Sequence, residues 1–514
     1  MQTRQDKRLV FKEQDNGNWS PRDPDLLPLG YFSQSRMPLT WVNPNGSETN
    51  RSAFLWSHSA FDYIRNFTVK GGSPPYLFYL TEPVAGVTLT TQAPSWNPNL
   101  SLWANITIDH LQFGSGTKVF EINCKDQNNT IITLEMTVTV DDSKFVFVQQ
   151  DAVGGDGSFS LPYGTFQDVY TTSTSNTAHA GKIVVFRTGT YLVDNFDTAN
   201  TALQMNNNKP SGWIPFENEI VTLNVQANII IGEPTGGPFV DYYFGNVTYT
   251  GGDTTAANIK IFTGFGSHNR IVLDRPRFVD ILSGTSGTDN EACLYFSDNG
   301  FSSHTNISVI DPYYENLIGS SNGVAFLDFY SVTNAAIVGG TAINCSNNYG
   351  LWIKSKNDQL MAAGFNMYDT TDQIANRLFS INQADAGLSD PVCVVQILGC
   401  KAYRPTDGLF ADTTLMLGDS NQPWGTVYCD RLTIVGTVRD NADDAPILGN
   451  ATLHSCVVVN DLSTKIPTFV TSVNNLLTSR SNLGVYVSSD GGILEAYSEY
   501  GKQGADYISV ADLI

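Results

Sequence analysis

Residues 323–355 read GVAFLDFYSVTNAAIVGGTAINCSNNYGLWIKS, and this stretch decides the fold. It contains three short runs of apolar and β-branched residues, Val324–Phe329, Ala335–Val338 and Leu351–Ile353, with Ser, Thr, Asn and Gly between them. Each run has the length and composition of a β-strand, and no segment between them has the periodicity of an amphipathic helix. A chain that returns to a strand after about 8 to 15 residues suits a coil of stacked parallel sheets, so the stretch predicts a parallel β-helix.

Comparable strand runs recur along most of the chain. They begin at Ile183, so we expect a right-handed, single-stranded parallel β-helix over residues 181–460. No strict repeat unit is visible, which indicates an irregular coil, and residues 361–383 break the rhythm and are expected to leave the coil. Residues 461–514 lose the strand spacing and are expected to cap the rod or to hold chains together in a small β region. The predicted fold class is therefore all-β.

Alternating strands of a different kind precede the coil. Residues 66–142 contain several short strand runs separated by turn signals, beginning with a Gly-Gly-Ser-Pro-Pro turn at residues 71–75. Regular short strands with turns between them indicate a β-sandwich. Residues 1–65 hold three tryptophans and many Pro and Asn without a clear period. They are expected to form an N-terminal attachment segment, or only to pack against the sandwich.

Two motifs in the sandwich region carry a resemblance. GGSPPYLFYL at residues 71–80 and LEMTVTVDD at residues 134–142 resemble the first and last strands of immunoglobulin-like domains found in bacterial and phage proteins. The resemblance implies an Ig-like sandwich that serves as a spacer or weak adhesion module displayed outside a cell. It implies no catalysis.

Residues 143–180 form a linker between the sandwich and the coil. Within them Thr165 is placed to cap a short helix that carries Phe166, Val169 and Tyr170 on one face. The first rung of a β-helix exposes unpaired strand edges, so we expect this helix to cover it.

The same junction resembles a known group of proteins. GDGSFSLPYGTFQ at residues 155–167, followed by GTY at residues 189–191, resembles the start of the coil in phage tailspikes and other pectate-lyase-like β-helix proteins. The resemblance implies a spike or tail fibre of a tailed phage, and such proteins are usually homotrimers. It does not specify an activity.

Charge and hydropathy exclude several classes of partner. Lys and Arg number 29 against 50 Asp and Glu, a formal net charge of −21, and no basic cluster follows the first few residues. Because phosphate binding needs concentrated positive charge, we expect no nucleic-acid partner. The N-terminus lacks the apolar core of a signal peptide, and no run of about 18 apolar residues occurs, so we expect neither conventional secretion nor membrane insertion. A protein made in a host cytoplasm and displayed on the exterior of a virion fits these features.

Motifs for cofactors and metals are missing from the sequence. It has no P-loop, dinucleotide fingerprint, HExxH, GxSxG or paired CxxC motif, so we expect neither a cofactor nor a metal site. The seven cysteines are widely spaced and mostly lie in apolar runs, which favours reduced core thiols over disulfides. The six histidines are dispersed and are predicted to be surface or corner residues.

Carboxylates are the remaining candidates for catalysis. Asp274, Asp298 and Asp328 each follow or end an apolar strand run, and Lys354 follows a fourth run. They recur about one coil apart, so we expect a column on one sheet or at one corner. Two adjacent acids would lie ~5 to 10 Å apart, the range in which a carboxylate pair cleaves a glycosidic bond, and repulsion would raise one pKa. Alternatively, these acids are solvated corner residues.

Aromatic and basic side chains near these acids are candidate contacts for a glycan, because aromatic rings can stack on sugars and a basic group can pair with an acidic sugar. The predicted glycan-binding residues are Tyr313, Tyr314, Tyr330, Trp352, Lys354 and Arg277. In the same region, Asp311 and Glu315 form a second candidate pair of carboxylates.

Three functions remain open from the sequence. The leading prediction is a virion spike or tail fibre that binds a host-surface polysaccharide through its β-helix and attaches to other virion proteins by its N-terminal segment. Trimerisation would multiply modest contacts with such a polymer. The second is a depolymerase, a glycoside hydrolase or lyase, on the same fold. The third is a purely structural decoration of the virion.

Overall fold

A computed structural model covers the chain. It describes residues 11–13, 19–21, 37–42, 50–55, 63–170, 178–194, 202–205, 208–217, 219–231, 240–251, 261–264, 269–281, 291–296, 304–317, 324–329, 332–343, 345, 349–353, 357–368, 377–381, 392–403, 415–417, 426–430, 432–436, 451–454, 457–460, 471–473 and 476–479.

Two four-stranded sheets form the N-terminal part, after a short hairpin of β1 (Phe11–Glu13) and β2 (Trp19–Pro21). One sheet has the order β3 (Thr40–Trp41), β5 (Tyr63–Lys70), β8 (Trp103–Ile108), β7 (Val87–Gln92). The other has the order β4 (Asn50–Leu55), β10 (Ile131–Val140), β9 (Thr117–Lys125), β6 (Leu77–Leu80), and the short helix α2 (His110–Phe113) follows β8. All pairs are antiparallel except β4 with β10. The two sheets are compatible with the predicted sandwich, and β3 and β4 add strands from the expected attachment segment.

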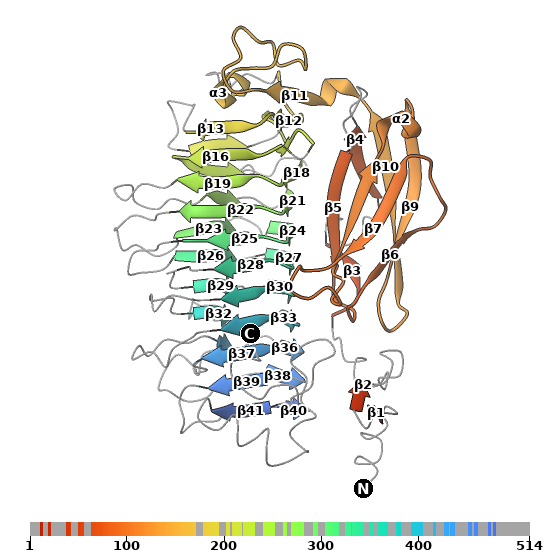
Figure 1. Cartoon of the computed structure of the whole chain (residues 1–514), viewed down its shortest axis with the longest axis vertical. Helices are drawn as coiled ribbons and strands as arrows, with labels where there is room; N and C mark the ends of the chain where they lie inside the picture. The colour runs from red at the N-terminus through yellow and green to blue at the C-terminus, as the bar shows by residue number, and fades with distance from the viewer. Residues whose placement is uncertain are drawn as a thin grey trace.

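Three long parallel sheets follow the sandwich, which confirms the parallel β-helix (Figure 1). The twelve-stranded sheet consists of β11 (Phe145–Val148), β12 (Ile183–Phe186), β15 (Gly212–Pro215), β18 (Val240–Gly245), β21 (Asn269–Asp274), β24 (His304–Ile310), β27 (Val332–Val338), β30 (Asn357–Ala363), β33 (Val392–Leu398), β36 (Thr426–Asp430), β38 (Ala451–His454) and β40 (Thr471–Val473). The eleven-stranded sheet consists of β13 (Gly189–Val193), β16 (Val221–Val225), β19 (Thr248–Gly251), β22 (Arg277–Ile281), β25 (Tyr313–Glu315), β28 (Thr341–Ile343), β31 (Asn366–Tyr368), β34 (Lys401–Tyr403), β37 (Thr433–Gly436), β39 (Val457–Asn460) and β41 (Leu476–Ser479). The eight-stranded sheet consists of β14 (Ala202–Met205), β17 (Asn228–Ile231), β20 (Phe262–Gly264), β23 (Glu291–Phe296), β26 (Val324–Phe329), β29 (Tyr349–Ile353), β32 (Arg377–Ile381) and β35 (Leu415–Leu417). The right hand of the coil stays a prediction.

One expectation about the course of the coil is wrong. The described residues of this stretch, 361–368 and 377–381, stay in it, because β30, β31 and β32 pair in register with the coils on either side. Leu360, Met361 and Ala362 are all buried, so both faces of this strand are covered and the polar alternation of a half-exposed strand is lost. At the far end, β40 and β41 carry the paired strands to Ser479, beyond residue 460.

A two-residue corner joins the twelve-stranded to the eleven-stranded sheet in successive coils. The first corner residue has a positive φ at Asn246, Arg275, Asp311, Gly339, Gly364 and Gly399. Its N–H donates to the last carbonyl of the strand in the next coil, as from Arg275 to Ile310 at 2.7 Å. The residue after the corner donates to the second corner residue of the preceding coil, as from Tyr313 to Pro276 at 2.9 Å. The ladder of hydrogen bonds therefore continues around this edge of the rod.

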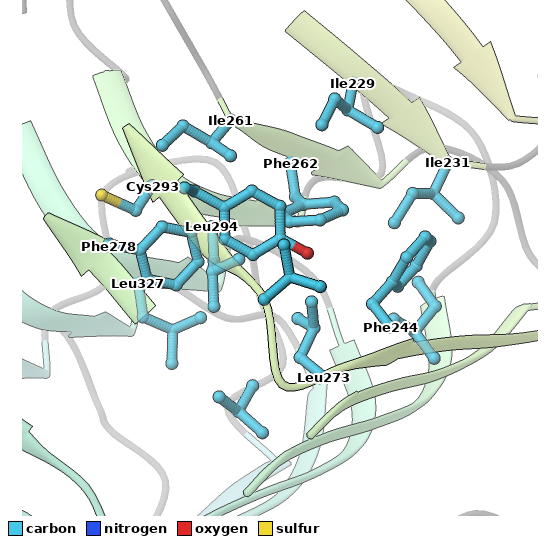
Figure 2. Close-up of a cluster of buried hydrophobic side chains, with 14 of the residues drawn as sticks. Ile229, Ile231, Phe244, Ile261, Phe262, Leu273, Phe278, Cys293, Leu294 and Leu327 are labelled. Carbon is cyan, nitrogen blue, oxygen red and sulfur yellow. The ribbon is translucent and has the colours of Figure 1, made fainter. Parts of the chain in front are cut away.

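Large apolar side chains fill the inside of the coil (Figure 2). Tyr249, Phe278 and Tyr314 stack on consecutive rungs with ring centroids 5.2 and 5.1 Å apart. At the first rung the predicted helix α3 (Phe166–Val169) is present, and Thr165 caps it through a reciprocal hydrogen-bonded pair with Asp168. Its apolar face, including Phe166, is buried against the interior of the first coils.

The sandwich lies alongside the coil, with β5 against β21, β24 and β27 of the twelve-stranded sheet (Figure 1). Outward side chains of that sheet join the sandwich core in one apolar cluster; these are Val185, Ile214, Tyr243, Val272, Ala336, Met361 and others. Small residues such as Ala336 allow close approach. The three corner glycines are required by the same contact, since a Cβ on Gly364 would lie 2.7 Å from Leu102 Cδ1. The domain that the resemblance suggested as a spacer therefore covers one face of the rod.

Candidate functional site

Asp274 lies beneath the sandwich and cannot contact a glycan. It is 1% exposed, and its carboxylate accepts hydrogen bonds from Asn66 Nδ2 at 2.7 Å and from the Tyr243 hydroxyl. It also pairs with Arg275 Nε at 3.2 Å. The prediction that Asp274 belongs to a column of acids is also wrong, because its register partner in the next coil is Ile310. Asp274 ends a strand of the twelve-stranded sheet, whereas Asp328 belongs to the eight-stranded sheet.

The polar cluster around Asp274 ties the sandwich to the coil. Asn66 Oδ1 accepts from Asn105 Nδ2 at 2.9 Å, so the network continues into the sandwich. The Arg65 guanidinium lies 4.3 Å from the centroid of the Tyr243 ring, a cation–π contact across the interface. Because these groups are buried among apolar side chains, they satisfy one another and specify how the two parts dock.

The second candidate carboxylate pair is also held by separate structural contacts. Burial raises the pKa of Asp311, and this effect is opposed by the Gly340 N–H, which donates to Asp311 Oδ1 at 3.1 Å. Glu315, at the far end of β25, accepts a hydrogen bond from the Tyr313 hydroxyl at 3.0 Å. Neither carboxylate contacts the other, so they do not form a pair poised around one bond.

Arg277 and Tyr313 meet on the outer face of the eleven-stranded sheet. They are register partners on β22 and β25, and the guanidinium lies 4.2 Å from the centroid of the tyrosine ring. Arg277 is exposed and Tyr313 is half-buried. The Tyr313 hydroxyl donates to Glu315, and both burial and this carboxylate raise the pKa of Tyr313. The three side chains form a platform with an aromatic ring, a cation and a carboxylate.

Tyr314, the neighbour of Tyr313, points the other way. It is 1% exposed and stacks on Phe278 in the core, so it is not available to a ligand and the prediction of a glycan contact there is wrong. The alternation of side chains along a strand explains the difference between the two adjacent tyrosines.

Asp328 and Trp352 occupy neighbouring positions in one column of the eight-stranded sheet. The register pairs Tyr295 with Asp328 and Asp328 with Trp352, so an acidic position lies between two aromatic ones at the ~4.8 Å spacing of stacked strands. Leu294 and Leu327, which precede Tyr295 and Asp328 in their strands, are buried, and the side chains of Asp328 and Trp352 lie outside those that the structure describes. Asp298, Tyr330 and Lys354 lie outside the described residues.

Sequence reasoning missed Tyr295 and the interface partner Asn66. Tyr295 stands between Leu294 and Phe296 in an apolar run, so the sequence alone does not single it out. Its link to Asp328 appears only when the two strands are aligned in register. Asn66 gave no signal, because 208 residues separate it from Asp274. Within the described part of the chain, no group of three or more His, Cys, Asp or Glu could hold a metal ion. Among the helices of the same residues, none is long and apolar enough to cross a membrane.

Comparisons with known proteins add no relative. No family model matches the chain, and neither a curated protein nor a solved structure matches it. The function must therefore be argued from the exposed faces of the coil.

Proposed function

We propose that this chain is a virion spike or tail-fibre protein that binds a host-surface polysaccharide along the uncovered faces of its β-helix. The observation that carries the proposal is the Arg277–Tyr313–Glu315 platform on the eleven-stranded sheet. An aromatic ring fixed by a neighbouring cation offers a flat surface for a sugar ring, and the carboxylate offers acceptors for sugar hydroxyls.

The docked sandwich supports the same proposal. It covers part of the twelve-stranded sheet with apolar contacts, so a long polymer has the eleven- and eight-stranded sheets left to contact. Hydrogen-bonded strands hold their outward side chains in place before a ligand binds. The protein therefore loses less conformational entropy when it binds the polymer. Oligomerisation would multiply such contacts, and a homotrimer is part of the proposal.

Binding of labelled host-envelope polysaccharide to the purified protein tests the proposal. Tyr313→Ala and Arg277→Ala should each weaken binding about two- to tenfold, in line with the loss of a stacked ring or its cation. Lys118→Ala is the matched control, because Lys118 makes a similar contact with Phe113 in the sandwich, far from the coil face. Unchanged affinity in both platform variants would refute this site, and no binding to host cells or glycans would favour a structural decoration.

A depolymerase is the second candidate, and the column Tyr295–Asp328–Trp352 favours it. A glycosidase normally uses two carboxylates, and Asp328, at a register position between two aromatic residues, would supply one of them. Incubation with polysaccharide followed by assays for reducing ends and unsaturated uronates detects hydrolysis and elimination. Asp328→Asn should abolish product release with little loss of binding. Product release that persists in this variant would remove Asp328 from catalysis.

A further inference from the structure

The exposed column that leads to the platform is rich in hydroxyl groups. Register partners on the outer face of the eleven-stranded sheet run from Thr190 through Thr222 and Thr248 to Arg277 and Tyr313. All five are exposed or half-buried. The three threonines lie on neighbouring strands, which are ~4.8 Å apart, so a polymer parallel to the rod axis would meet a hydroxyl group on each of these three strands.

These hydroxyls have no protein partner among the residues that the structure describes, whereas many hydroxyls of the sandwich do. Thr133 Oγ1 donates to Asn123 at 2.7 Å, and Thr117 and Thr139 share a hydrogen bond of 3.0 Å. By contrast, the side chains of Thr222 and Thr248 leave both a donor and acceptors open to solvent. The column is thus equipped for the hydroxyl groups of a sugar.

Charge on this face does not favour an anion, because the exposed Asp280 and the half-buried Glu315 lie on the same strands as Arg277 and Tyr313. Of the positions that continue the column, Thr341 and Asn366 are neutral, and Lys401 is 9% exposed and covered by the Trp96 ring, 5.0 Å from its Nζ. The Arg277 guanidinium stacks over the Tyr313 ring, whose hydroxyl donates a hydrogen bond to the Glu315 carboxylate. With a net charge of −21 on the whole chain, the surrounding potential repels polyanions.

We propose that the ligand is an uncharged polysaccharide that lies along the threonine column and reaches the Arg277–Tyr313 platform. This inference rests on the proposed function and narrows its substrate class. The threonine hydroxyls exchange hydrogen bonds with sugar hydroxyls, and Tyr313 stacks on a ring at the end of the column. Arg277 holds the tyrosine ring in place and does not select an acidic sugar.

Binding to a panel of soluble polysaccharides tests the inference, with dextran, mannan and galactan as neutral probes and hyaluronate, alginate and polygalacturonate as anionic probes. We expect binding to a neutral member, with an affinity that changes less than about twofold between low and high salt, because no counterions are released. Thr222→Val and Thr248→Val keep the shape and the β-branched side chain, and each should weaken binding about three- to tenfold through one lost hydrogen bond. Thr139→Val in the sandwich is the control and should leave affinity unchanged.

The outcomes separate the inference from the function on which it rests. Binding confined to an anionic probe, with steep loss in salt, would overturn the uncharged ligand and leave a polysaccharide-binding function standing. Binding to a neutral probe that is unaffected by both Thr→Val changes would overturn the column as its site. Binding to neither set would count against the proposed function itself.

Discussion

Asp274→Ala should be among the most destabilising single changes in the chain. The carboxylate accepts from two buried donors, the Asn66 amide and the Tyr243 hydroxyl, and both residues are 2% exposed. A buried donor that loses its acceptor costs about 1 to 3 kcal/mol, so two cost about 2 to 6 kcal/mol. Arg275 also loses the carboxylate beside it. We expect the free energy of unfolding to fall by about 4 kcal/mol.

Urea unfolding followed by tryptophan fluorescence and circular dichroism measures this loss, and coincident transitions would justify one free energy. Asp241→Ala is the matched control on the same sheet, because Asp241 pairs with Arg270 while its side chain is 34% exposed, and it should cost about 1 kcal/mol or less. In a double-mutant cycle, Asn66→Ala and Asp274→Ala should be coupled by about 1 to 3 kcal/mol. Additive effects, or equal costs for Asp274→Ala and Asp241→Ala, would refute the idea that this network fixes the interface.

Three further changes test other parts of the fold. Gly364→Ala should cost about 2 kcal/mol or more, measured as a fall in melting temperature, because its φ is +68° and the sandwich loop leaves no room for a Cβ. Gly181→Ala, with a φ of +67° and open space, is the control and should cost less. Burial and the nearby Lys182 lower the pKa of His179, so the folded state resists protonation of this imidazole. The free energy of unfolding should therefore keep its full His179 contribution above pH ~6.5 and decline as the pH falls below that value. His179→Gln should remove this part of the decline in a pH series of urea unfolding curves. Thr165→Ala should lower the free energy of unfolding by about 1 kcal/mol through loss of the helix cap, and an unchanged value would contradict a stabilising role for that helix.

The β-helix architecture could be predicted from the sequence because each strand run is recognised from neighbouring residues in the chain. Apolar runs such as Val324–Phe329 become strands wherever they pack, and the cap at Thr165 depends on residues within one helical turn. Residues 361–383 were misread for a physical reason. A strand buried on both faces lacks alternation, and the sequence does not say that a distant sandwich provides the second covering.

The candidate site was only partly predictable because phase depends on the lengths of connections. Asp274, Asp298 and Asp328 follow one another at about one coil in residue number. Counting residues could not show that Asp274 ends a strand of the twelve-stranded sheet while Asp328 lies in the eight-stranded sheet. The adjacent pair Tyr313 and Tyr314 illustrates the same limit. One is a ligand candidate and the other is core, and only the register of the strand distinguishes them.

The two-residue corner has a consequence for how such a rod can change in evolution. Its first residues are separated by unequal stretches of chain, the shortest from Gly339 to Gly364 and the longest from Arg275 to Asp311, while the corner itself keeps its length and its hydrogen bonds. From Asn246 to Gly399 this edge keeps a constant length, and the differences in length fall on the other two edges. New loops can therefore be grafted there, beside the face proposed to bind a polysaccharide, without altering which strands pair. The loops that would adjust the proposed polysaccharide specificity thus lie on other edges than the hydrogen-bonded corner.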